Sequence, residues 1–238
     1  MTVAVELQDV SRAFGQGHTR VVALHPTSLT VGVGEFVAIM GPSGSGKTTL
    51  LSLVGGLDRP TSGRIIVAGQ DLATLKGGGL AVLRRRVVGY VFQDLNLLAG
   101  LTARENISLP MELDGRPARE TRAAADATLA SLGLDELGDR FPNDLSGGEQ
   151  QRVAIGRALV GGRKILLADE PTGALDSMTG ESVMRLLRTH CNDGGTAILV
   201  THDAAHAAWA DRVVFLRDGR IVDETPQQPR QAEFAGAA

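Results

Sequence analysis

The residues that most directly suggest chemistry are a glycine-rich run that ends in a lysine and a threonine. Gly41-Pro-Ser-Gly-Ser-Gly-Lys-Thr48 matches the pattern G-x-x-x-x-G-K-[ST] at every fixed position. Glycines allow successive backbone N–H groups to turn toward one anion, and a helix that follows adds its partial positive charge. Lys47 is long enough to reach the β- and γ-phosphates of a nucleotide, and the Thr48 hydroxyl is an oxygen ligand for Mg²⁺.

This run therefore predicts a nucleotide phosphate site, with a glycine-rich turn that binds nothing as the alternative. An apolar stretch, Phe36–Met40, precedes the run, and a helical stretch, Lys47–Val54, follows it, which is the context that the motif requires. The predicted phosphate-binding residues are Gly41, Pro42, Ser43, Gly44, Ser45, Gly46, Lys47, Thr48 and Thr49.

A second apolar stretch ends in two acids, Ile165-Leu-Leu-Ala-Asp-Glu170. In an open parallel sheet, ligands bind at the carboxyl ends of the strands, so Asp169 should lie beside the phosphate loop. We expect Asp169 to support Mg²⁺ through Thr48 or a water, and Glu170 to accept a proton from an attacking water. A strand that simply ends in polar residues is the alternative for the pair taken alone.

The segment Leu145-Ser-Gly-Gly-Glu149 resembles the L-S-G-G-Q signature of ABC-transporter ATPases, and it lies between the two features above, as in that family. By its residue types, Ser146 is a good N-cap for a helix whose free N–H groups form an anion site. The resemblance implies that Ser146, Gly147, Gly148 and Glu149 bind the γ-phosphate of ATP held by the opposite subunit. Glu149 departs from the glutamine of the signature, and we expect little effect.

The resemblance also implies roles for four further residues. Gln93 matches the glutamine that binds Mg²⁺ and senses the transporter, and His202 matches the histidine that contacts the γ-phosphate. Asp176, in Ala174-Leu-Asp176, matches a loop that crosses a dimer interface. Phe14 matches the aromatic residue that stacks on adenine, with core packing as its alternative.

The elements that must hold these residues alternate between strand-like and helical patterns. Strands are predicted at 3–7, 21–31 (interrupted at Pro26), 36–40, 64–67, 87–92, 165–169, 196–200 and 212–216. Helices are predicted at 47–54, across 103–137 with an end at Leu109-Pro110, and at 179–191 and 203–209. Gly77-Gly-Gly79 is interpreted as a flexible joint.

These elements predict an α/β fold, in which a P-loop NTPase core carries an antiparallel β part near the N-terminus and an inserted helical subdomain. We expect one ATPase domain over residues 1–224, with the helical insertion at about 94–160. A loose tail is expected at 225–238, where Pro226 and Pro229 interrupt any periodicity.

Composition limits the classes of protein. Among 238 residues, 43% are hydrophobic and 21% are charged, which is typical of a globular chain. The net charge of −3 offers no basic excess for nucleic acid, so no nucleic-acid partner is expected. Cys191 is the single cysteine, which excludes an intrachain disulfide. No apolar run is long enough to be a transmembrane helix.

The resemblance implies an ATPase that uses ATP and Mg²⁺, pairs with a second ABC ATPase subunit, and drives an integral-membrane permease from the cytoplasmic face of the membrane. Gly89-Tyr-Val-Phe-Gln-Asp-Leu-Asn-Leu-Leu98 and Asp169-Glu-Pro-Thr-Gly-Ala-Leu-Asp176 look like the macrolide-exporter and lipoprotein-releasing subclass. The alternatives are an ATP-gated signalling or scaffold subunit, as in cell-division relatives, and a soluble ABC ATPase of translation or DNA repair.

Overall fold

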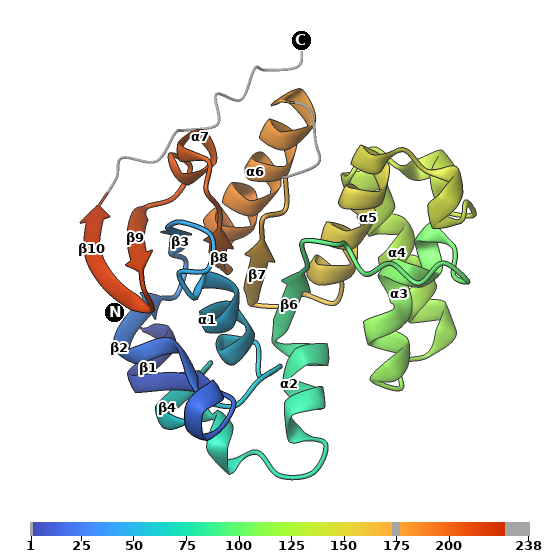
Figure 1. Cartoon of the computed structure of the whole chain (residues 1–238). Helices are drawn as coiled ribbons and strands as arrows, with labels where there is room; N and C mark the ends of the chain where they lie inside the picture. The colour runs from blue at the N-terminus through green and yellow to red at the C-terminus, as the bar shows by residue number, and fades with distance from the viewer. Residues whose placement is uncertain (1, 173–176, 227–238) are drawn as a thin grey trace.

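The structure is a computed structural model that describes residues 2–172 and 177–226. Among the described residues, six strands form a mixed sheet, which extends from the left of Figure 1 to its centre. Its order is β10 (Arg220–Pro226), β9 (Arg212–Arg217), β3 (Phe36–Met40), β8 (Thr196–Val200), β7 (Ile165–Asp169) and β6 (Val88–Val91). All neighbours are parallel except β9 and β10. A smaller antiparallel sheet has the order β2 (Val21–Gly32), β1 (Val3–Phe14), β4 (Ser62–Val67) and β5 (Gln70–Asp71).

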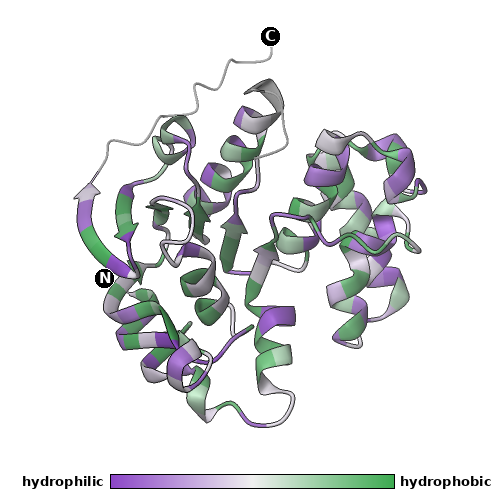
Figure 2. Ribbon diagram, viewed as in Figure 1, coloured by the Kyte–Doolittle hydropathy of each residue, from purple (hydrophilic) through white to green (hydrophobic). Residues whose placement is uncertain are grey.

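The central strands of the larger sheet are buried on both faces, as continuous apolar runs in parallel sheets require. Along β3, Val37 and Ile39 face one hydrophobic cluster, whereas Phe36 and Ala38 face the other. The first cluster packs α1 (Lys47–Val54) between the two sheets. The second packs the larger sheet against α6 (Ser177–Asn192) and α7 (Ala204–Ala207). Figure 2 shows the apolar ribbon concentrated in these strands.

Three helices form a separate group with its own core, seen to the right of the sheets in Figure 1. They are α3 (Ala103–Leu113), α4 (Ala118–Ser131) and α5 (Gly147–Leu159). Ile107, Leu129 and Val153 are buried where these helices meet. The helical group is joined to the larger sheet by α5, whose Ile155 and Ala158 lie in the core of that sheet, and by Leu186 of α6, which packs against both cores. The sequence limits of the helical insertion stay a prediction.

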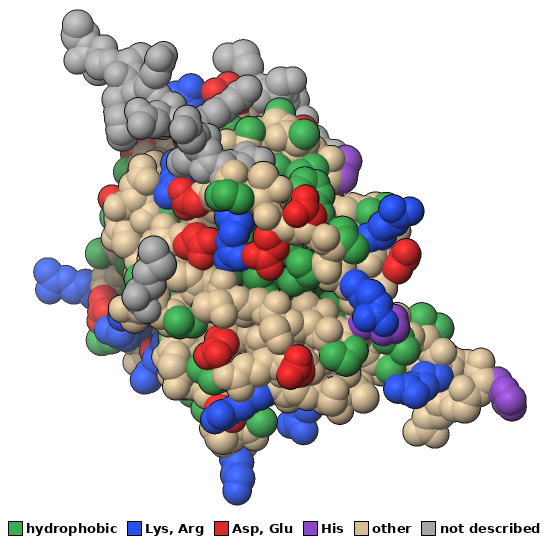
Figure 3. All heavy atoms as spheres, turned by 90° about the vertical axis from the view of Figure 1, so that its left-hand side faces the viewer, with side chains coloured by type: hydrophobic (Ala, Val, Ile, Leu, Met, Phe, Trp, Pro, Cys, Tyr) green, Lys and Arg blue, Asp and Glu red, His purple; other side chains and the backbone are tan. Residues whose placement is uncertain are grey.

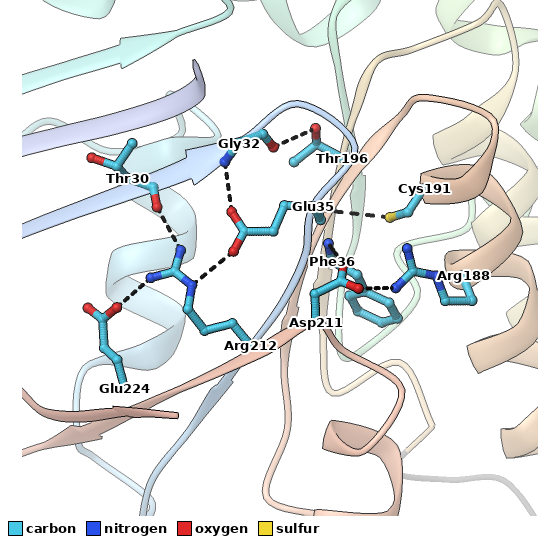
Figure 4. Close-up of polar contacts among 10 residues, drawn as sticks. All are labelled: Thr30, Gly32, Glu35, Phe36, Arg188, Cys191, Thr196, Asp211, Arg212 and Glu224. Atoms are coloured by element: carbon cyan, nitrogen blue, oxygen red, sulfur yellow. Dashed lines mark hydrogen bonds and ion pairs between the residues drawn. The ribbon is translucent and has the colours of Figure 1, made fainter. Parts of the chain in front are cut away.

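The two sheets are joined by an arginine that contacts both (Figure 4). Arg212 of β9 donates from Nε to Glu35 over 2.9 Å and from Nη2 to the Thr30 carbonyl of β2 over 2.7 Å, and it also pairs with Glu224 of β10. The Glu35 carboxylate accepts a second hydrogen bond from the Gly32 N–H over 2.7 Å. The smaller sheet is therefore fixed to the larger sheet at the beginning of β9.

Two predicted interruptions at proline are wrong. α3 continues through Pro110 to Leu113, because the buried Met111 beyond the proline packs into the helical core. β2 continues through Pro26 because it is an edge strand whose register against β1 shifts close to the proline, a place where no regular ladder bond is lost.

The short strand β5, the helix α2 (Gly79–Arg86) and the strand β10 were not predicted from the sequence. α2 begins within the expected flexible joint, and β10 pairs with β9 as far as Pro226. Thr225 and Pro226, expected in the loose tail, are thus part of the sheet, whereas 227–238 lie outside the described residues. Within the described ranges, none of the helices combines the length and apolar character needed to cross a membrane.

Candidate functional site

The loop between β3 and α1 has the conformation that its glycines predict. Gly44 and Gly46 have φ values of 77° and 100°, which favour glycine. A Cβ atom at Gly46 would lie 2.4 Å from the carbonyl oxygen of Ala23 on β2, and one at Gly41 would lie 2.0 Å from that of Leu216 on β9. Strands from both sheets therefore approach the loop backbone so closely that side chains are excluded.

Lys47 is the first residue of α1, and it folds back over this loop. Its Nζ atom donates to the carbonyl oxygens of Gly41 and Pro42 over 2.9 and 3.0 Å. The residue is only 9% exposed, so its positive charge is held in a largely desolvated place above the loop. A buried cation beside free helix N–H groups is suited to binding phosphate.

The end of β7 brings a buried carboxylate to the same place. Asp169 is only 4% exposed, and it lines the same cavity as Thr48 of α1. Its Oδ1 atom has no partner among the described residues. Burial raises the pKa of the Asp169 carboxyl, with a further increase from the neighbouring charge of Glu170, and the nearby Thr48 hydroxyl opposes the shift.

An unpartnered carboxylate oxygen in a buried position is stabilised by a cation. Together, Thr48, Gln93 and Asp169 offer hydroxyl, amide and carboxylate oxygens, which is the donor chemistry that Mg²⁺ prefers when phosphates and waters supply the remaining ligands. The residues present therefore fit the predicted Mg²⁺ site.

Glu170 and His202 form a pair at the carboxyl ends of β7 and β8. His202 Nδ1 lies 2.8 Å from Glu170 Oε1, and this hydrogen bond together with the glutamate charge raises the pKa of His202. Glu170 has a φ of 46°, rare for a residue with a side chain, and its N–H is fixed by the Val200 carbonyl at 2.9 Å. The histidine side chain remains 74% exposed, so the pair lies at the solvent side of the site.

A single cavity of about 970 Å³ connects these groups. It is lined by Ala23, Gly41, Pro42, Ser43, Gly44, Gly46, Lys47, Thr48, Thr49, Gln93, Asp94, Leu95, Gly147, Gln150, Gln151, Asp169, Glu170, Val200 and His202. Ser45 does not line it; its hydroxyl is buried without a partner. The volume lies at the upper end of the range of small-molecule sites, roughly 300–1,000 Å³.

The predicted signature segment begins α5 with a reciprocal cap. The Ser146 hydroxyl accepts from the Glu149 N–H, and the Glu149 carboxylate accepts from the Ser146 N–H and hydroxyl over 2.7 and 2.8 Å. These hydrogen bonds lower the pKa of Glu149. Glu149 thus has a structural role that the sequence comparison with the signature did not reveal. Gly147 lines the cavity, whereas Ser146, Gly148 and Glu149 do not.

Besides Ser45, Ser146, Gly148 and Glu149, one further predicted site residue in the described part of the chain, Phe14, does not line the cavity. Phe14 is 43% exposed at the end of β1, which excludes the core-packing alternative, and the guanidinium of Arg12 lies 4.3 Å from its ring centre. Asp176 lies outside the described residues. Conversely, six of the residues that line the cavity were not identified from the sequence, namely Ala23, Asp94, Leu95, Gln150, Gln151 and Val200. All but Ala23 lie within two positions of a predicted site residue, whereas Ala23 carries no sequence signal because only the fold brings β2 to the loop.

Comparison with models of known families matches residues 24–173, more than half of the chain, to the family described as ABC transporter. The chain belongs to the ABC transporter family. MacB, the macrolide export ATP-binding/permease protein of Azoarcus sp. (strain BH72), is 49% identical over 98% of this chain and 36% of its own length. MacB of Brucella melitensis is 49% identical over 94% of this chain and 35% of its own length. The chain thus spans about a third of the length of these relatives.

Solved structures of the ABC transporter family agree with the fold. The ATP-binding cassette MJ0796, solved as a dimer in a post-hydrolysis state bound to ADP and Pi, is 41% identical, with a TM-score of 0.88 over 94% of this chain and 99% of the cassette. A second dimeric structure of MJ0796 gives the same values. The family resemblance and the α/β cassette fold expected from the sequence are therefore confirmed.

Proposed function

We propose that this chain binds and hydrolyses ATP as the nucleotide-binding subunit of an ABC transporter. The observation that carries the proposal is the single cavity in which Lys47, the buried Asp169 and the Glu170–His202 pair meet. Lys47 and the N–H groups of its loop bind the β- and γ-phosphates. Asp169, Thr48 and Gln93 hold Mg²⁺, which when bound supplies positive charge that offsets the charge of the phosphates.

In the hydrolytic step, Glu170 orients the attacking water and accepts its proton. The backbone of Glu170 is held by its left-handed conformation and by the hydrogen bond from its N–H to the Val200 carbonyl. A fixed backbone limits the positions of the carboxylate, which is what a general base requires. His202 contacts the γ-phosphate and also donates to Glu170, so it orients the base before ATP arrives. Phe14 supplies an exposed aromatic face for the adenine ring.

We further propose that two copies of the chain close around two ATP molecules. Ser146 and Gly148 do not line the cavity of their own chain, so a phosphate held by a second subunit could bind the first N–H groups of α5, with the Ser146 hydroxyl exchanging its contact with Glu149 for that phosphate. Asp176, whose role rests on the family resemblance, would lie at this interface. The dimeric structures of MJ0796, with 41% sequence identity to this chain, support the arrangement.

A second cavity, of about 350 Å³, supports the proposal of a permease partner. Its lining combines apolar side chains with four arginines: Gly55, Leu57, Ala81, Arg84, Arg85, Val88, Tyr90, Phe92, Leu109, Pro110, Leu113, Arg157 and Arg163. We call this surface the arginine groove. It suits an amphipathic segment with acidic side chains, such as a cytoplasmic segment of a permease. The chain would then act at the cytoplasmic face of the membrane.

The similarity to MacB supports an export or extrusion system rather than a signalling or scaffold complex, since those relatives are macrolide export proteins. Within that class, the transported substrate is selected by the permease and is not encoded in the residues of this site.

The proposal is tested by separating binding from hydrolysis with Glu170→Gln. Glutamine keeps the size of the side chain but does not accept the proton, so phosphate release should fall by a factor of about 10²–10⁴. Titration with a fluorescent ATP analogue should show unchanged affinity. Glu181→Gln, an exposed glutamate paired with Arg185 on α6, is the matched control and should hydrolyse normally. A Glu170→Gln protein that releases phosphate at the wild-type rate would contradict the assigned role.

A further inference from the structure

Arg157 of α5 makes an unusual pair of contacts with the loop that carries Gln93. Its Nη1 atom donates to the Asn96 carbonyl over 2.7 Å, and its Nη2 atom donates to the Leu95 carbonyl over 2.6 Å. Leu95 and Asn96 both have left-handed backbone conformations, with φ values of 58° and 49° respectively. Such residues are strained, so the two hydrogen bonds help to keep the loop in its present shape.

This arginine also lies between the nucleotide cavity and the arginine groove. Leu95, whose carbonyl it binds, lines the nucleotide cavity together with Gln93 and Asp94. Arg157 itself lines the arginine groove, together with Phe92 at the end of β6. One side chain therefore connects the surface proposed for the permease with the loop that presents Gln93 to the nucleotide.

The two contacts require the shape of arginine. A guanidinium presents parallel N–H donors to two neighbouring acceptors, whereas the ammonium of lysine is a point charge on a flexible stem. Arg163, a neighbouring arginine of the same groove, is used differently. It donates to the carbonyls of Arg157 and Ala158 at the end of α5 and to that of Arg85 at the end of α2. Arg163 thus fixes helix ends and makes no hydrogen bond to residues 93–98.

We propose that Arg157 is a positioning residue that holds the 93–98 loop so that Gln93 faces the nucleotide cavity, and that it links this loop to the arginine groove. The inference rests on the proposed function, because Gln93 has a role only if the cavity binds Mg²⁺ and ATP. It predicts that a positive charge at position 157 is not sufficient to hold the loop without the two parallel N–H donors of the guanidinium.

The test compares Arg157→Lys with Arg163→Lys and Gln93→Ala in the full chain. Amide hydrogen exchange of residues 93–98, measured without nucleotide, should be faster by about tenfold or more in Arg157→Lys, the factor that corresponds to losing one charge-assisted hydrogen bond. Arg163→Lys should lower the melting temperature and leave that exchange unchanged. Arg157→Gln keeps a donor and removes a partly buried charge, and it repeats the test if the lysine variant does not fold.

A second readout tests the link to Gln93. The Mg²⁺ concentration that gives half-maximal affinity for a fluorescent ATP analogue should rise several-fold in Arg157→Lys and in Gln93→Ala. The double variant should need no more Mg²⁺ than Gln93→Ala, since residues that act through one another are not additive. Additive shifts, or unchanged loop exchange in both Arg157 variants, would overturn the inference while leaving the proposed function intact.

The two proposals fail in different ways. The proposed function, and the inference with it, would be overturned if the wild-type chain bound no ATP. The same conclusion would follow if every site variant bound ATP as well as the wild-type chain does. A Gln93→Ala variant with an unchanged Mg²⁺ requirement would remove the role of Gln93 and therefore that of Arg157, even if the wild-type chain hydrolyses ATP.

Discussion

Lys47 concentrates the positive charge of the phosphate site in one side chain. The other two lysines of the chain, Lys76 and Lys164, do not line the cavity. We therefore expect Lys47→Ala to weaken ATP binding by at least about tenfold, since a hydrogen bond between charged groups contributes roughly 1.5–3 kcal/mol. Titration with a fluorescent ATP analogue measures the effect, and Lys76→Ala is the matched control. Equal affinities for the two variants would rule out the phosphate role of Lys47.

His202 should report its contact with Glu170 through its own titration. The glutamate raises the pKa of the imidazole, so protonated His202 should persist to a higher pH than an ordinary histidine with a pKa of about 6.5. While Glu170 is ionised, the charged pair is fully formed below the ordinary pKa of histidine and is lost as the pH rises through the raised pKa of His202. NMR titration of the ring should show this midpoint moving down toward the ordinary value in Glu170→Gln. A midpoint that does not move would show that the 2.8 Å contact is absent in solution.

At the residue scale, the sequence is sufficient to predict site residues whose motifs have a fixed spacing from a buried strand. Lys47, Asp169 and Glu170 follow buried strands, and the parallel sheet brings the ends of those strands together. Residues whose role depends on a distant partner could not be predicted. Arg157 acts on carbonyls about 60 positions earlier in the chain, and nothing in its local sequence indicates that contact.

At the element scale, the close contact of β6 with α5 gives a stability prediction. A Cβ atom at Gly89 would lie 2.0 Å from the Ala158 carbonyl oxygen, so Gly89→Ala must push the strand and the helix apart. We expect a loss of about 1–3 kcal/mol in the free energy of unfolding. Gly100→Ala is the control, because no atom lies within 4 Å of its Cβ position. Denaturant unfolding that gives the same free energy for both variants would show that this packing is looser than described.

The elements also show where periodicity is a poor guide. β3, β7 and β8 were predicted with their observed bounds. A strand that is covered on both faces is a continuous apolar run, so its ends are clear in the sequence. α2 has only one fully buried residue, Leu83, and three consecutive arginines, so its sequence lacks a clear apolar stripe. The sequence of β10 shows little alternation of apolar and polar residues because most of its residues are exposed, although the strand pairs with β9 along its length.

At the scale of the whole molecule, the sheets form a fixed frame around the phosphate loop, and the helices α3 to α5 form a second packing unit. Arg212 joins the two sheets, whereas the helical unit contributes its own core and the start of α5. Figure 3 shows acidic and basic side chains interspersed on the face that lies on the left of Figure 1, in keeping with the small net charge of the chain.

The central claim is that two chains share two ATP molecules, and Glu170→Gln tests it most directly. The variant keeps Lys47, Asp169 and Ser146, and it removes a negative charge near the γ-phosphate, so it should bind ATP and remain closed. Size-exclusion chromatography with light scattering should give about twice the single-chain mass of 24.9 kDa with Mg-ATP, and the single mass without nucleotide. The double variant Lys47→Ala/Glu170→Gln should stay at the single mass under both conditions. A Glu170→Gln protein that is saturated with ATP and still elutes as a single chain would contradict the shared-site account.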